Sequence, residues 1–214
     1  KYLERSYIEY FYPEIETFLS NPSKQKYKMQ IKELNEDNLK NFNTKRKIGE
    51  HGSEICELIR ADNVVDFITY IEKRNISSKT LIIDNSIYET NLFLSKKDKS
   101  FSLIEYSAFF GSQQIFRYLY QNGSKLTSSI WPYIIHGNNP DMIHLLEENN
   151  VKTFDDSYQY LIVEAFKCHN NDFAVYLQDK CSEEEKIYDQ FLLKKHLKHY
   201  NFKLVKMWDS KQLI

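Results

Sequence analysis

Two apolar doublets recur along the sequence at nearly regular intervals, and this recurrence restricts the fold more than any other feature. The copies of the first doublet are Ile115-Phe116, Met142-Ile143, Phe173-Ala174 and Leu204-Val205. The intervals between them are 27 (142 − 115), 31 (173 − 142) and 31 (204 − 173) residues. The copies of the second doublet are Tyr118-Leu119, Leu145-Leu146, Tyr176-Leu177 and Met207-Trp208. Self-similarity at a period of about 20 to 50 residues indicates stacked structural repeats.

The sequence between two copies predicts a pair of antiparallel helices. Apolar residues on both sides of Gly111 have the spacing of amphipathic helices. Asn122-Gly123 supplies residues that tolerate left-handed backbone where the second helix must end. Asn139-Pro140-Asp141 supplies an N-cap, a first-turn proline and a first-turn acid where the next copy must start. We therefore expect an all-α fold of stacked helix-turn-helix units.

The central copy resembles the ankyrin repeat. Against the family pattern T-P-L-H-x-A-A-x-x-G, the chain reads SLIEYSAFFG from Ser102 to Gly111. The family's second helix, I-V-x-x-L-L-x-x-G, is matched by Ile115, Phe116, Tyr118, Leu119 and Gly123. Ser102 and Glu105 stand where the family has Thr and His, whose hydrogen bonds hold the first turn together.

The resemblance extends over most of the chain. Phrases such as IRADNVVDFITYIEKRNIS and HGNNPDMIHLLEENNV are similar to divergent ankyrin proteins of parasitic flagellated protozoa, in which a domain of unknown function overlaps the repeats. This resemblance implies an ankyrin-like solenoid and a binding role, and it implies no particular activity.

Two regions are expected along the chain. Residues 1–47 should form an N-terminal helical capping segment, with a Tyr- and Phe-rich helix over residues 1–20 that is interrupted at Pro13. Residues 48–214 should form an ankyrin-like array of about five units, of which the one near residues 76–99 is degenerate. Repeat arrays need such end segments because a terminal unit would otherwise expose its apolar face.

Charge and composition disfavour several kinds of partner. With 29 basic and 30 acidic residues, the chain has no field that would attract nucleic acid or an anionic membrane. No apolar run approaches the roughly 18 residues that a membrane span requires. The three cysteines, Cys56, Cys168 and Cys181, are unclustered and odd in number, which favours reduced thiols and a cytoplasmic location. The scattered glycines form no phosphate loop, so we expect no cofactor.

Only two groups of residues suggest metal or nucleophile chemistry. His196 and His199 can share a helix face, but no third ligand stands at metal spacing, so surface or packing roles are favoured and no metal site is predicted. Cys168-His169 lies at the turn between paired helices, where nothing in the sequence supplies the base and orienting acid that a catalytic thiol needs. No catalytic residue is therefore predicted.

Ankyrin proteins vary in the loop before the first helix and at the two residues before the turn glycine, which project toward the concave face. The resemblance thus assigns partner contacts to five residues, Phe101, Phe109, Phe110, His136 and Lys167. Exposed adjacent phenylalanines would dominate the energetics of an interface. The alternative is that Phe109 or Phe110 packs against the neighbouring repeat.

The expected function is that of a non-catalytic scaffold that binds another protein through the concave face and loop tips. The alternative is a structural component of a large cytoskeletal or axonemal assembly, suggested by the family and by apolar C-terminal residues that need a cover, such as Met207 and Trp208. A third hypothesis, an enzyme, rests only on the Cys and His residues named above.

Overall fold

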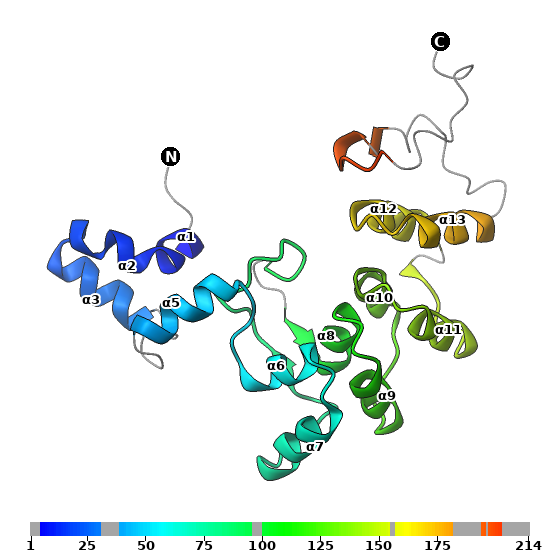
Figure 1. The fold of residues 1–214 in the computed structure, drawn as a ribbon, viewed down its shortest axis with the longest axis horizontal. Coiled ribbons are helices and arrows are strands. Elements are labelled where there is room, and N and C mark those ends of the chain that lie inside the picture. The colour runs from blue at the N-terminus through cyan, green and yellow to red at the C-terminus, as the bar shows by residue number, and fades with distance from the viewer. Residues whose placement is uncertain are drawn as a thin grey trace. The chain divides into compact units, whose positions relative to one another are not determined.

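The computed structural model describes residues 5–30, 39–95, 100–154, 157–181, 194, 195 and 197–202 (Figure 1). These residues are mostly helical, and their one sheet has two short strands, so the predicted helical character is confirmed. The chain divides into two compact units. Unit 1 comprises residues 1–57 and 82–101, and unit 2 comprises residues 58–81 and 102–214. The domain boundary expected between residues 47 and 48 stays a prediction.

Unit 1 begins with a series of short helices. These are α1 (Arg5–Tyr10), α2 (Tyr12–Ile15), the 3-10 helix η1 (Glu16–Phe18), α3 (Asn21–Gln30) and α5 (Leu39–Ile48). Pro13 lies in the first turn of α2, where its missing N–H removes no helical hydrogen bond. The expected interruption at Pro13 is therefore present, as a break between α1 and α2. Tyr12, Phe42 and Tyr88 form the buried core of this unit.

Residues 76–95 depart from the repeat pattern. Strand β1 (Ile82–Ile83) pairs with strand β2 (Phe101–Ser102). Further along, Thr90 donates hydrogen bonds from its backbone N (3.0 Å) and from Oγ1 (2.8 Å) to the carbonyl oxygen of Gly49. The degenerate helix pair expected near residues 76–99 is not formed in the described part of that range, because its β-branched run pairs as a strand instead.

From residue 54 onward, helices occur in pairs. The pairs are α6 (Glu54–Arg60) with α7 (Val64–Lys73), α8 (Leu103–Phe109) with α9 (Gln113–Gln121), α10 (Trp131–Gly137) with α11 (Pro140–Glu148), and α12 (Gln159–Lys167) with α13 (Asn171–Lys180). A 3-10 helix, η2 (Ser128–Ile130), precedes α10. Within unit 2, the first helices α8, α10 and α12 pack on one another in chain order, and α7 packs against α9 (Figure 1).

Each turn between paired helices contains one residue with left-handed backbone. These residues are Asp62 (φ 48°), Gly111 (φ 67°), Asn138 (φ 48°) and His169 (φ 58°), and Tyr200 (φ 54°) occupies the next such position. From Gly111 to Tyr200 they follow the intervals of 27, 31 and 31 residues that the apolar doublets show. The sequence period is therefore also a period of the backbone.

Hydrogen bonds at these turns close the helix ends in a common way. After α8, the N–H of Ser112 donates to the carbonyl of Ser107 (3.0 Å), and the N–H of Gly111 donates to the carbonyl of Ala108 (3.2 Å). This pair of bonds is the Schellman motif, which satisfies carbonyls that a helix end leaves free. The same pair of bonds is present at the C-terminal ends of α6, α7, α9, α11 and α12. Helix α10 differs, since the N–H of Asn138 donates to Ile134 (3.0 Å).

The recurring apolar residues face the interior, as predicted. Ile115, Met142 and Phe173 are 0%, 2% and 7% exposed. In the second doublet, Leu119, Leu146 and Leu177 are all buried. Leu204-Val205 and Met207-Trp208 lie outside the described residues.

Ser102 and Glu105 close the first turn of α8. The Oγ of Ser102 accepts from the backbone N–H of Glu105 (3.4 Å), and Oε2 of Glu105 accepts from the backbone N–H of Ser102 (2.9 Å). This reciprocal arrangement is a capping box. The start of α8 is therefore closed by hydrogen bonds between these two residues.

Candidate functional site

The five residues predicted to contact a partner differ in their exposure. Phe101 and Phe109 are buried, at 2% and 8% exposure, whereas Phe110 and His136 are half-buried and Lys167 is exposed. Phe109 stacks on the His136 ring (centroids 4.9 Å apart) and meets Phe110 edge-on (5.0 Å). The expectation of an exposed phenylalanine pair is therefore wrong for Phe109, because its ring packs between its neighbours as in the alternative reading.

Three of the five predicted residues nevertheless lie together. Phe109, His136 and Lys167 occupy the last turns of α8, α10 and α12, and they are separated by the same 27 and 31 residues as the doublets. Glu164 links two of them: its Oε1 lies 3.0 Å from Nε2 of His136, and its Oε2 accepts from Nζ of Lys167 (2.7 Å). The stacking of the first helices thus aligns these positions into one row.

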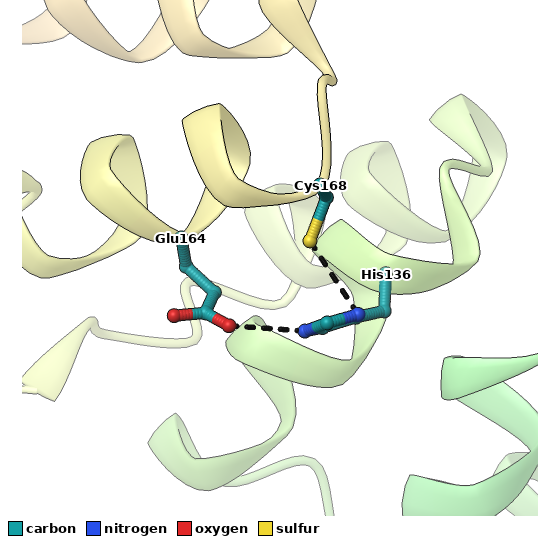
Figure 2. A group of neighbouring side chains, drawn as sticks. All are labelled: His136, Glu164 and Cys168. Atoms are coloured by element: carbon teal, nitrogen blue, oxygen red, sulfur yellow. Dashed lines mark hydrogen bonds and ion pairs between the residues drawn. The ribbon is translucent and has the colours of Figure 1, made fainter. Parts of the chain in front are cut away.

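The chemically distinctive part of this row is the cluster of His136, Glu164 and Cys168, which we call the His136 cluster (Figure 2). The imidazole lies between the other two side chains. Its Nδ1 is 3.4 Å from Sγ of Cys168, while its Nε2 faces the Glu164 carboxylate. One potential ligand atom from each of the three residues lies within 4.8 Å of the others.

Local structure explains why these residues meet. Glu164 and Cys168 are four residues apart at the end of α12, so their side chains lie on one face of that helix. His136 comes from the last turn of α10 and points toward that face, as Figure 2 shows. Beside it, Gly137 has no side chain and allows the backbones of α10 and α8 to approach closely. The cluster thus joins two successive helix pairs.

Glu164 is a buried carboxylate that remains ionised. It is 4% exposed, and burial alone would raise its pKa. Hydrogen bonds from His136 and Lys167, together with their charges, outweigh the burial and lower the pKa of Glu164 to about 2. The carboxylate is therefore a fixed negative charge at the centre of the row.

Cys168 has the opposite electrostatic character. Burial and the nearby Glu164 charge raise the pKa of the Cys168 thiol to about 12, against a smaller opposing effect of Lys167. A thiol is nucleophilic as the thiolate, so a catalytic cysteine needs a lowered pKa. The order thiol, imidazole, carboxylate resembles a catalytic triad in its contacts, but the thiol is held in its unreactive protonated form.

The donor types of the His136 cluster also suit a metal ion. Imidazole nitrogen, thiolate sulfur and carboxylate oxygen are the protein ligands of Zn²⁺. From the sequence, Cys168 was considered only with its neighbour His169, and no base or orienting acid was expected beside the thiol. In the structure, His169 faces away and its Nε2 contacts the carbonyl of His199 (3.1 Å). The partners of Cys168 are instead His136 and Glu164, and Glu164 was not singled out. The 31-residue period relates His136 to Lys167, the residue before Cys168, and was the signal that could have brought Cys168 and His136 together.

A groove lies at the opposite end of α12. It has a volume of about 330 Å³ and is lined by Ser128, Ser129, Pro132, Phe154, Ser157, Tyr160 and Leu161. Phe154 is 70% exposed and Tyr160 is 50% exposed. Large exposed aromatic side chains beside a groove are a typical feature of protein interfaces.

None of the helices in the described part of the chain is both long enough and apolar enough to span a membrane.

Comparison with known proteins assigns no family. No protein-family model matches the chain, and neither the curated proteins nor the solved structures contain a significant match to it.

Proposed function

We propose that the chain is a non-catalytic scaffold of ankyrin-like helical repeats that binds another protein. The groove beside Phe154 and Tyr160 is the observation that carries this proposal. Both aromatic rings are more exposed than a packing role requires, and both lie in or just before α12. Burial of one such ring against a partner would contribute about 2 kcal/mol of apolar transfer free energy.

Three features support the repeat part of the proposal. Helix pairs recur at the intervals of the apolar doublets, each turn carries one left-handed residue, and first helices pack on first helices. In a repeat array each unit contacts mainly its neighbours, and variable side chains in the loops give each array its own binding surface.

Phe154 takes the role that the sequence analysis gave to Phe101. Both precede the first helix of a unit, but Phe101 is held in strand β2 whereas Phe154 follows an irregular segment. By the intervals of 27 and 31 residues the position equivalent to Phe101 is Gln159, so Phe154 is an additional contact residue in the loop before a first helix and does not occupy the predicted position. Phe110 is half-buried and Lys167 is exposed, so both remain accessible to a partner, although neither lines the groove.

A binding experiment with matched variants tests the proposal. The tagged chain is used to isolate partners from the native cell, and the recovered partner is then titrated against purified chain. We expect Phe154→Ala combined with Tyr160→Ala to weaken the Kd at least about tenfold. Phe18→Ala is the control, because Phe18 is 87% exposed and lies in unit 1. Equal affinities of wild type and the double variant, with unchanged helix content, would contradict the proposed surface.

The alternative cytoskeletal role stays a prediction. It was motivated in part by apolar residues near the C-terminal end, and Met207, Trp208, Leu213 and Ile214 lie outside the described residues.

A further inference from the structure

The His136 cluster contains two potential donor atoms whose spacing suits one metal ion. Zinc bonds of about 2.3 Å to sulfur and 2.0 to 2.1 Å to nitrogen, at a tetrahedral angle, place the two donor atoms about 3.6 Å apart. Nδ1 of His136 and Sγ of Cys168 are 3.4 Å apart. The spacing of these two donor atoms is therefore close to that of two ligands of one zinc ion.

Glu164 is placed to supply a third ligand. Its carboxylate is anionic and lies within 4.8 Å of the other donor atoms. Because the carboxylate contacts Nε2 of His136, it must rotate toward Nδ1 to share an ion with that nitrogen. Glutamate has three side-chain torsions that allow such a rotation, and α12 holds its backbone fixed.

We propose that His136, Glu164 and Cys168 form a three-ligand site for a divalent cation of the Zn²⁺ type. The ion joins the end of α10 to the end of α12 and so connects two successive helix pairs. Three protein ligands leave the fourth tetrahedral position to water or to a donor group of a partner. This site is independent of the proposed protein-binding groove, since it lies at the other end of α12.

Binding changes the protonation of the thiol. The S–H bond of Cys168 breaks, a bond forms between sulfur and the metal, and the proton passes to the buffer. No electron is transferred. Since the thiol is protonated in the metal-free protein at neutral pH, each bound ion releases about one proton.

Lys167 opposes cation binding and makes a specific test possible. Its ammonium group bonds to Oε2 of Glu164 at 2.7 Å and so places a positive charge beside the site. The Lys167 side chain is 38% exposed and can move into solvent when a metal binds. Lys167→Gln should therefore bind the cation more tightly than wild type, by about two- to tenfold.

The test uses Co²⁺ as a spectroscopic probe for the site. The metal-free chain is kept reduced with a phosphine and titrated with Co²⁺ alone, and Zn²⁺ is then added to displace it. We expect one Co²⁺ per chain, a sulfur-to-cobalt charge-transfer band, visible absorption typical of four ligands, and loss of both signals on adding Zn²⁺. Calorimetric titration of the chain with the metal, repeated in buffers of different protonation enthalpy, measures the number of protons released per bound ion.

Three variants assign the ligands. Cys168→Ser should abolish the charge-transfer band, while Cys181→Ser should retain it, because Cys181 is buried and its Sγ bonds to the carbonyl of Leu177. His136→Gln and Glu164→Gln should each weaken binding at least about tenfold. The amide of Glu164→Gln can still accept a hydrogen bond from the imidazole, so it separates metal ligation from orientation of the ring.

Several results would overturn the proposal. One is the absence of a charge-transfer band at millimolar Co²⁺, and another is a band that persists in Cys168→Ser. Wild-type affinity in Glu164→Gln would show that Glu164 only orients the imidazole and would remove it from the ligand set. Helix content is compared among all variants by circular dichroism, and Lys167→Gln tests the site without altering a ligand.

Discussion

Gly137 packs so closely against Ala108 that a methyl group on Gly137 would lie 2.1 Å from the carbonyl oxygen of Ala108. The same methyl group would lie 3.0 Å from the backbone nitrogen of Gly111. Both obstacles are main-chain atoms of the preceding helix pair, so neither can move as a side chain would. The missing Cβ at Gly137 therefore sets the distance between α8 and α10.

Gly137→Ala should destabilise unit 2 by about 3 kcal/mol. Helix propensity alone favours alanine over glycine by about 1 kcal/mol, but overpacking against fixed backbone costs more. Chemical denaturation followed by circular dichroism measures the change. Gly52→Ala is the control, because its Cβ would meet only the flexible side chain of Lys45. A neutral or stabilising effect of Gly137→Ala would show that the two helices separate easily.

Asp62 should contribute to stability through two separable effects. Its backbone is left-handed, and its carboxylate accepts hydrogen bonds from the N–H groups of Gln114 and Ile115, each at 3.0 Å. Asp62→Ala loses both the tolerance for this backbone and the cap of α9, so we expect a loss of about 2 kcal/mol.

Two further substitutions at Asp62 separate these effects. Asp62→Gly removes the strain of the left-handed backbone but also removes the cap. Asp62→Asn keeps one acceptor oxygen for the cap, and asparagine tolerates a left-handed backbone. The expected order of unfolding free energies is Asp, Asn, Gly, Ala, from highest to lowest. An alanine variant as stable as the asparagine variant would refute the cap.

The buried carboxylate of Glu164 should make stability depend on acid pH. Its folded-state pKa of about 2 lies below the ordinary value of 4.5, so its contribution is complete above about pH 5 and is lost as the pH falls toward 2. The shift corresponds to about 3 kcal/mol. Unfolding free energies of wild type and Glu164→Gln, measured with a chelator present, should therefore converge between pH 5 and pH 2.

Glu148→Gln serves as the matched control for this acid dependence, because Glu148 lies on the exposed surface of α11. The difference between wild type and Glu148→Gln should stay within about 0.5 kcal/mol over the same range. Parallel pH profiles of wild type and Glu164→Gln would mean that His136 and Lys167 do not stabilise the Glu164 carboxylate.

Cys168 should react slowly with alkylating agents in the metal-free protein. With its pKa raised to about 12, the thiolate is far rarer at pH 8 than in an ordinary thiol with a pKa of about 8.5. Even after allowing for the greater nucleophilicity of a basic thiolate, iodoacetamide should label Cys168 roughly 40- to 100-fold more slowly than glutathione. Peptide mass spectrometry measures the rate.

Glu164→Gln should accelerate labelling of Cys168, since it removes a negative charge that disfavours the thiolate. Labelling of the wild-type thiol as fast as glutathione would instead indicate activation by His136, and it would return the enzyme hypothesis to consideration.

The sequence period predicted the helical part of unit 2 well. Burial of Ile115, Met142 and Phe173 follows from amphipathic spacing, which is a local property of each helix. Caps could be predicted for the same reason: the side chain of Asn139 accepts from the N–H of Asp141 at 3.0 Å, as the N-cap assignment required.

Features that depend on packing between successive helix pairs were not predicted. For Phe109, both a partner contact and packing against the neighbouring repeat were left open, because its neighbours on α10 are unknown until the helices are stacked. The pairing of His136 with Cys168 joins residues 32 positions apart, and only the stacking of α10 on α12 brings them together. Strand β1 was not predicted, because the short apolar run that contains Ile82 and Ile83 fits a helix or a strand equally well.

Asn201 has a consequence for how the chain would respond to mechanical force. Its Nδ2 bonds to the carbonyl of Phe166 (3.0 Å) and to Oδ1 of Asn171 (2.7 Å), so the last described turn is anchored on the turn before it. Pulling from the C-terminal end would load this anchor before it loads the contacts between α10 and α12. Extension should therefore proceed as discrete steps, each releasing one helix pair of about 30 residues, and not as a single rupture.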